Sequence, residues 1–396
     1  MRGVNEGGPA QFDFGLDAAQ EARAARLHRE SIVIDLLSQH AGGNIFAHYS
    51  EELQPDLEAR VAMALAAKGD GSGDLAEVVY WPYEMSKLGK SDLIREWFQT
   101  AGLTCGTYDI GVHDGHDPLW NKWEAVNARY ADLPWLRYVT TAAEIRQAKR
   151  DGFVAFYAHC QPESPIPRDL KAIDVAYAKG LRSLMLTYNR MDHVGVGCTE
   201  RVDAGLSMFG IDVVKHCNEI GMIVDVSHCG YLTTMDACRH STKPVNANHT
   251  AARSVYSHAR GKSDDALRAI AGTGGVIGVV AVPFFLTGDR RPTIEHMLDH
   301  IDYIANAVGW RHVALGTDWP LQVPDELLKV TLSPDNKALG FREQDNLDVT
   351  SRLIGFDDCR DLSNITRGLV KRGYPDNQIQ GILGENALRA IAEICD

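Results

Sequence analysis

No apolar run in this 396-residue sequence is long enough to cross a lipid bilayer as a helix. The longest apolar stretch, Gly275 to Leu286, contains glycine and proline and falls well short of the ~18 residues that a membrane span requires. Residues 1–30 are polar and lack the apolar segment of a secretory signal. We therefore expect a soluble protein that stays in the cytoplasm.

Clusters of basic residues and closely paired cysteines are also missing. The formal net charge is -13 and no long run of Lys or Arg occurs, which argues against binding to nucleic acid or to an anionic membrane. The eight cysteines form no C-x-x-C pair, so a four-cysteine structural zinc site has no support. We expect reduced thiols and a small-molecule partner.

The chain does contain a regular alternation of short apolar segments with amphipathic helical stretches. This alternation is typical of parallel strands joined by crossover helices. It predicts a (β/α)8 barrel of the TIM type with additional helices, whose strands lie at residues 31–37, 104–111, 153–159, 181–188, 222–227, 244–248, 275–282 and 312–317. We expect one domain over residues 1–396, with an N-terminal extension at 1–30, a helical insertion at about 51–96 and C-terminal helices at 364–396.

Four of these strand ends carry a side chain that can do chemistry. In such a barrel the reactive groups follow the carboxyl ends of the strands, where His228, His249, Asp318 and Tyr188 are placed. A single histidine after a strand is more often a hydrogen-bonded group with no catalytic role. Two histidines at successive strand ends, with an aspartate at another, favour a site for a zinc-like divalent ion. Asp318 could bind the ion, move a proton, or do both.

The segments around these residues resemble the membrane (renal) dipeptidase family, zinc enzymes built on a (β/α)8 barrel. The similar strings are IVDVSHCGYLTTMDAC, PVNANHTAARSVYSHARGKSDDALRAIAGTGGVIGVV, HVALGTDW and NITRGLVKRGYPDNQIQGILGENALRAI, and the match is thin before residue 150. The resemblance implies that His228 and His249 hold the family's second zinc. It also implies that Asp318 binds the first zinc and moves the proton, and that Arg260 lies near a carboxylate of the substrate.

Three departures from the family's pattern change the expected metal site. Leu37 and Gln39 stand where the family has a His-x-Asp pair that binds the first zinc, and Gln161 stands where a bridging glutamate is expected. Tyr188 replaces a histidine that contacts the substrate. Carboxylates are what allow two dications to lie close together, so their loss predicts a single metal ion, most simply zinc.

The third ligand of that ion stays open at this point. His228 and His249 are expected to hold it, and Gln161, Asp318 or His159 could complete the set. Asp35 and His40 could compensate for the lost His-x-Asp pair, but their positions do not fit its register.

We expect a metal-dependent hydrolase that acts on a small amide or dipeptide-like substrate. Asp318 would be its catalytic residue, and Arg260 and Tyr188 would bind the substrate. Two alternatives remain: a non-hydrolytic enzyme such as a decarboxylase, lyase or hydratase on the same barrel, and an inactive binding protein. A homodimer is expected from the resemblance and from the general preference for symmetric oligomers.

Overall fold

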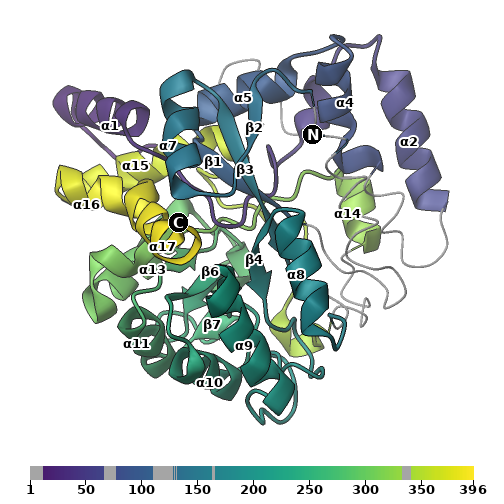
Figure 1. Ribbon diagram of the computed structural model, residues 1–396. Helices are drawn as coiled ribbons and strands as arrows, with labels where there is room; N and C mark the ends of the chain where they lie inside the picture. Colours follow the sequence, from purple (N-terminus) through teal and green to yellow (C-terminus); the bar gives the residue numbers. More distant parts are fainter. Residues whose placement is uncertain are drawn as a thin grey trace.

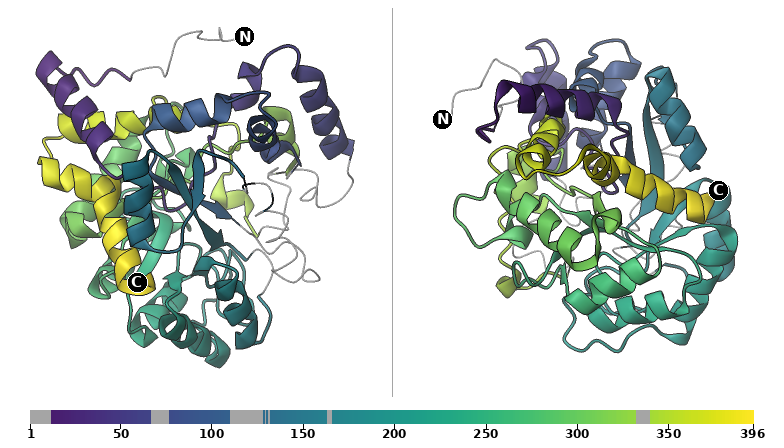
Figure 2. Two further views of the ribbon diagram at one scale, coloured as in Figure 1. Left: turned by 45° about the horizontal axis from the view of Figure 1, so that its top comes forward. Right: turned by 90° about the vertical axis from the view of Figure 1, so that its left-hand side faces the viewer.

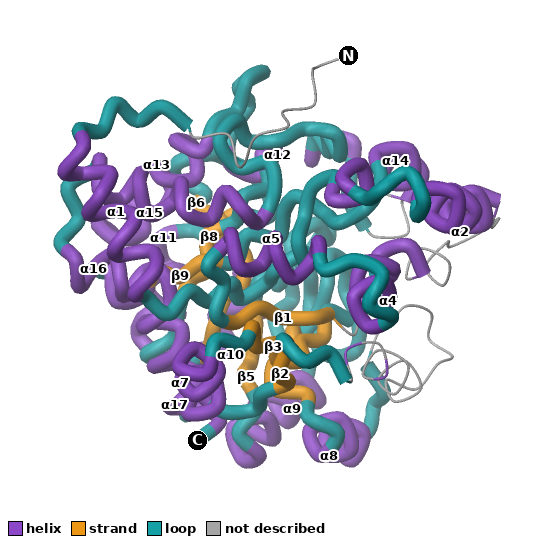
Figure 3. Tube along the Cα trace, turned by 90° about the horizontal axis from the view of Figure 1, so that it is seen from above, coloured by secondary structure: helices purple, strands orange, loops and turns teal. Residues whose placement is uncertain are grey.

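The computed structural model describes residues 12–66, 77–109, 128, 130, 132–162, 166–331 and 340–396. A curled parallel sheet lies at its centre, surrounded by helices (Figures 1 and 3). The order of its strands is β1 (Cys105–Asp109), β3 (Val154–Cys160), β4 (Leu181–Met185), β5 (Ile223–Asp225), β6 (Val245–Ala252), β8 (Ile277–Val279) and β9 (Val313–Leu315). Two short strands lie off this path, since β2 (Leu136–Tyr138) pairs with β3 and β7 (Gly261–Lys262) pairs with β6.

The first predicted strand joins the two edges of this sheet. Ile34 bridges Cys105 of β1, and Asp35 bridges Leu315 of β9, both in parallel orientation. Backbone N–H groups of Asp35 and Leu36 donate to the carbonyls of Cys105 and Leu315, each at 2.9 Å. Every strand segment predicted from the sequence therefore corresponds to a strand or to this closing segment, and the predicted barrel-type α/β fold is confirmed.

The strand ends differ from the prediction in ways that matter for the site. Most strands are shorter than predicted, and residues 110–111 of the second predicted strand lie outside the described residues. The strand predicted to end at Asn248 instead continues to Ala252, because Ala251 and Ala252 pair with Gly261 and Lys262 of β7. Its pairing with β8 shifts register between Ala247 and Thr250, which is the position of His249.

The helices follow the strands in chain order and form the outer layer (Figure 1). Gly221 shows how the sequence ends one of them, because it takes the left-handed conformation (φ 82°) directly after α9 and two residues before β5 begins. The barrel helices are α7 (Ala142–Asp151), α8 (Leu170–Ala178), α9 (Met208–Ile220), α10 (Tyr231–His240), α11 (Asp264–Gly272), α12 (Pro283–Leu286) and α13 (Ile294–Val308).

Additional helices lie outside this ring. The N-terminal helix α1 (Ala18–Glu30) packs on α15 (Leu362–Lys371), as Figure 2 shows. The predicted insertion contains α2 (Gln54–Ala66), α4 (Trp81–Lys87) and the start of α5 (Leu93–Ala101), while its residues 67–76 lie outside the described residues. After α14 (Asp325–Thr331) and α15, the chain ends in α16 (Asp376–Gln380) and α17 (Asn386–Cys395). One domain over the whole chain stays a prediction.

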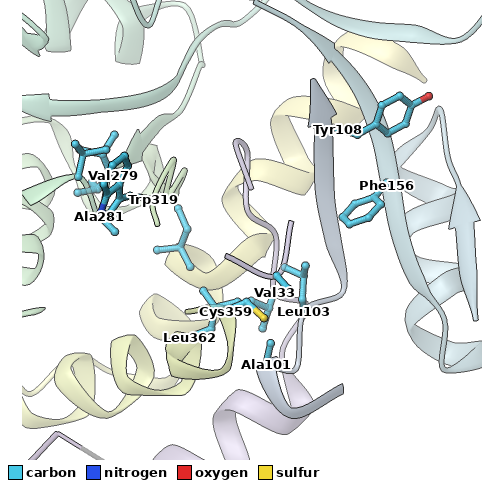
Figure 4. Packing of buried hydrophobic residues seen from close by; sticks show 14 of the residues in the cluster. Val33, Ala101, Leu103, Tyr108, Phe156, Val279, Ala281, Trp319, Cys359 and Leu362 are labelled. Atoms are coloured by element: carbon cyan, nitrogen blue, oxygen red, sulfur yellow. The ribbon is translucent and has the colours of Figure 1, made fainter. Parts of the chain in front are cut away.

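Apolar side chains fill the space between these layers in two clusters. Figure 4 shows Val33 and Leu103 close to Cys359 and Leu362, where the closing segment meets the start of α15. Leu37 is buried but belongs to neither cluster. Among the described residues, no helix combines the length and apolar character needed to span a membrane.

Candidate active site

His228 and His249 lie beside each other in the barrel. His228 follows strand β5, and His249 belongs to the adjacent strand β6. The centroids of their rings are 5.0 Å apart. Both side chains are buried. Burial, followed by the positive charge of Arg260, lowers the pKa of each imidazole well below its ordinary value. Both rings are therefore neutral and keep a lone pair, as a metal ligand requires.

Neighbouring side chains fix the orientation of His228. Its Nδ1–H donates to Oδ1 of Asn189 at 2.8 Å, which leaves Nε2 as the nitrogen with the lone pair. The ring of Tyr188 stacks on His228 with centroids 3.9 Å apart. Tyr188 was predicted to bind substrate, and its stacking places it next to the histidine pair. Sequence reasoning missed Asn189, which no strand-end rule distinguishes from its neighbours.

Among the residues that the structure describes, neither ring nitrogen of His249 has a hydrogen-bond partner, although the side chain is completely buried. Buried polar atoms are almost always satisfied by protein, water or a bound group. The close packing around it is made possible by two glycines, because a Cβ at Gly278 or Gly316 would lie within 2 Å of the Asn248 carbonyl oxygen. These glycines accommodate the irregularity in β6 that presents His249 at this point.

Arg260 braces the backbone that carries both histidines. Its Nη1 donates to the Ser227 carbonyl at 2.6 Å, and its Nη2 donates to the His249 carbonyl at 3.2 Å. Its Nε is buried and has no acceptor among the residues that the structure describes. The resemblance predicted that Arg260 lies near a substrate carboxylate, and this stays a prediction. In the structure Arg260 connects Ser227, after β5, to His249 in β6.

Lys262 extends this brace around His228. Its ammonium group donates to the carbonyls of Val226 (2.6 Å) and Cys229 (2.7 Å) and to Oγ1 of Thr234 (3.1 Å). All three donors of the ammonium group are thus used. Burial lowers the pKa of Lys262 to about 8. We define Arg260 and Lys262 as the cationic brace. Sequence reasoning missed Lys262 and predicted Arg260 only as a substrate contact.

Asp318 lies at the exit of β9 and is held by the first strand. Its N–H donates to the Leu37 carbonyl at 2.8 Å, and Oδ1 accepts from Nε2 of Gln39 at 3.0 Å. The residue has a left-handed backbone (φ 54°), which is unusual for a non-glycine residue. Burial raises the pKa of the Asp318 carboxyl to about 7, against the opposing effects of Arg260 and Gln39. The carboxyl can therefore both take and give a proton near neutral pH.

Gln161 directly follows β3 and is oriented by a carboxylate. Its backbone N–H and its side-chain Nε2 donate to the two oxygens of Asp109 at 2.9 and 3.0 Å. Because an ionised carboxylate only accepts, the NH2 group of the amide faces Asp109. The amide oxygen Oε1 is then the atom with which Gln161 can bind a metal.

The other candidate ligands have contacts of their own. The Nδ1 of His159 is hydrogen-bonded to Ser183 Oγ at 2.9 Å, whereas its Nε2 is buried without a hydrogen-bond partner among the described residues and lies 3.7 Å from Asp225 Oδ2. The Asp35 carboxylate accepts from Thr317 and from the backbone of Leu37. His40 Nδ1 is hydrogen-bonded to Tyr83 at 2.9 Å. Neither Asp35 nor His40 therefore replaces the lost His-x-Asp pair.

No three His, Cys, Asp or Glu side chains of the described residues are grouped closely enough to hold a metal ion. In this conformation neither Asp318 nor His159 completes a three-ligand set with the histidine pair. The amide of Gln161 is a different kind of donor and is compatible with that finding.

Comparison with known proteins gives a consistent assignment. The family model described as "Membrane dipeptidase (Peptidase family M19)" matches residues 21–335. This match extends to residue 21, well before the resemblance seen in the sequence, and does not include the C-terminal helices. A Klebsiella pneumoniae protein described as "Uncharacterized protein in pqqA 5'region" is 33% identical over 226 residues, covering 54% of this chain and 83% of that protein.

The chain is also similar in sequence to a dipeptidase and in structure to a protein whose crystal structure is known. "Dipeptidase verJ" of Clonostachys rogersoniana is 27% identical over 270 residues, covering 67% of this chain and 61% of that protein. The crystal structure of an amidohydrolase from Pseudomonas aeruginosa superposes with a TM-score of 0.72 at 25% identity, covering 94% of this chain and 99% of that one. The architecture is therefore shared over nearly the whole length of both chains.

Proposed function

The chain belongs to the membrane dipeptidase family and is a metal-dependent, dipeptidase-like hydrolase, and we propose that it cleaves a small amide or dipeptide-like substrate with a single zinc ion. The observation that carries this proposal is His249, whose two ring nitrogens are buried without a partner in the described part of the chain, beside the oriented ring of His228. Family membership implies a divalent metal, and the two neutral imidazoles support a site that holds one ion.

His228, His249 and the amide oxygen of Gln161 would hold the ion. Two neutral imidazoles and a neutral carbonyl oxygen are acceptable zinc ligands that leave coordination positions open. When bound, the ion supplies a Lewis acid that polarises the substrate carbonyl. At the positions of the expected His-x-Asp pair the first strand offers neither an imidazole nor a carboxylate to a second ion, since Leu37 is apolar and Gln39 is a neutral amide.

The remaining chemistry belongs to side chains of the chain itself. Oδ2 of Asp318, the oxygen that Gln39 does not contact, takes a proton from the attacking water and passes it to the leaving amine. The Nε–H of Arg260 is available to a carboxylate of the substrate, and Tyr188 covers one face of His228. The cationic brace keeps the two histidines in place during these steps.

The test is zinc analysis combined with turnover of a dipeptide panel in ¹⁸O-labelled water. We expect one zinc per chain and label in a product carboxylate. The His228→Ala variant should lose both zinc and turnover, whereas His240→Ala, at the end of α10, should keep both. A decarboxylated product without label would favour the lyase alternative, and tight ligand binding without turnover would favour a binding protein. The cytoplasmic location and the homodimer stay predictions.

A further inference from the structure

We propose that Gln39 is a positioning residue for the reaction, because its side-chain amide holds Asp318 in a fixed orientation that leaves the second carboxylate oxygen for proton transfer. The inference rests on the proposed function, in which Asp318 moves the proton. Its basis is the contact between Gln39 Nε2 and Asp318 Oδ1, at 3.0 Å, between residues 279 positions apart in the sequence.

The backbone on both sides of this contact is fixed. The Asp35 carboxylate accepts from the N–H of Thr317 at 2.8 Å and from its hydroxyl group, and it also accepts from the N–H of Leu37. The Leu37 carbonyl accepts from the N–H of Asp318 at 2.8 Å. Asp35 and Leu37 of the closing segment are thus hydrogen-bonded to the residues that follow β9. Gln39 is the last contact in this series and the one that reaches the reactive carboxyl.

Asp318 needs such support. A non-glycine residue in the left-handed region is held there by its surroundings, and strained residues of this kind concentrate at functional sites. Arg260 acts on Asp318 through its charge. The two Nη atoms of Arg260 donate to the carbonyls of Ser227 and His249. The hydrogen bonds of this guanidinium group therefore hold the backbone that carries the histidines. The hydrogen bond that orients the carboxyl therefore comes from Gln39.

An amide is chemically suited to this task. A glutamine N–H donates to the ionised carboxylate and adds no negative charge, so the pair is attractive in the form of Asp318 that accepts a proton. A glutamate at the same position has nearly the same shape, but ionised it offers no donor and repels Asp318. Leucine keeps much of the side-chain volume and removes the amide. These two substitutions separate the hydrogen bond from the packing.

The experiment is a double-mutant cycle of Gln39→Leu and Asp318→Ala, with Gln54→Leu as the matched control. Gln54, the first residue of α2, also uses its side-chain amide, donating to the backbone carbonyls of Phe46 and Tyr49. We expect Gln39→Leu and Gln39→Glu to lower kcat by up to about 100-fold with little change in KM, since misplacing a catalytic group costs rate at that scale. Zinc content should stay as in the parent protein, and Gln54→Leu should leave kcat unchanged.

The second readout is the melting temperature of the metal-free protein across the same cycle, which needs no activity. We expect Gln39→Leu to lower it in the parent and to have little effect beside Asp318→Ala, because the partner is then missing. Equal losses in both backgrounds would overturn the inference, and so would loss of zinc in Gln39→Leu. A parent protein without zinc or turnover would refute the proposed function. The metal-free cycle would still decide whether Gln39 holds Asp318.

Discussion

The Asp318 carboxyl that serves the reaction should destabilise the folded protein at neutral and alkaline pH. Burial raises its pKa from 3.8 to about 7, whereas the unfolded chain restores the ordinary value. Between about pH 4 and pH 7 the folded state therefore binds more protons than the unfolded state, and stability falls as the pH rises through that window. A shift of about 3 units corresponds to about 4 kcal/mol, which is reached above pH 7.

The substitution Asp318→Asn removes this titration. It keeps an oxygen that can accept from Gln39, and asparagine tolerates the left-handed backbone. Urea unfolding of the metal-free protein should show that the stability gained over the parent is about 2 to 3 kcal/mol larger at pH 8 than at pH 5. The same variant should lose about 10²-fold or more in kcat, as expected for a general acid–base group.

Asp132→Asn is the matched control for this measurement. Asp132 is also left-handed (φ 68°), but its side chain is exposed, so the same chemical change should leave the pH dependence of stability as it is in the parent. If Asp318→Asn gave the same gain at pH 5 and pH 8, the carboxyl would not be a buried group with a raised pKa. Its assignment as the proton carrier near neutral pH would then lose its physical basis.

Four further predictions concern the rate and the metal site. Because the carboxylate form is the base and its pKa is about 7, kcat/KM should rise with pH up to about 7 and level off above it; a flat profile from pH 5 to 8 would contradict this. Leu37→His combined with Gln39→Asp should add a second zinc per chain, measured by elemental analysis, whereas unchanged stoichiometry would show that the first strand does not limit the metal count. Arg260→Met leaves two buried carbonyls without donors and should cost about 2–5 kcal/mol in urea unfolding, together with weaker zinc binding. Gly316→Ala places a Cβ 1.7 Å from a carbonyl oxygen and should lower both the melting temperature and zinc content, while Gly272→Ala, which meets nothing within 4 Å, should lower neither.

The sequence predicted well those features that depend on local pattern. Strand and helix periodicity located the barrel segments, and the rule that reactive groups follow strand ends selected His228, His249 and Asp318. The end of β6 was predicted wrongly, because its continuation to Ala252 depends on pairing with β7, a two-residue strand that leaves no periodic signal. Local pattern therefore identifies the chemical side chains better than the limits of the strands that carry them.

The contacts that position those side chains were beyond the sequence. Gln39 and Asp318 are 279 residues apart, and Gln161 and Asp109 are 52 apart, so neither pair could be recognised from spacing. Arg260 was predicted from resemblance as a substrate contact. Its hydrogen bonds to the carbonyls of strands β5 and β6 depend on how those exits pack, which only the folded chain determines.

The two glutamines that replace expected carboxylates change the charge of the site as well as its ligands. Two dications 4 Å apart repel each other by about 17 kcal/mol at an effective dielectric constant of 20, and bridging carboxylates normally compensate for that repulsion. Here Gln39 and Gln161 are neutral, and each donates its amide to an aspartate. Arg260 and Lys262 already place two positive charges close enough to lower the pKa of both histidines. A second dication would add repulsion where the family's carboxylates are replaced by neutral amides, and this balance of charge supports the single ion that we propose.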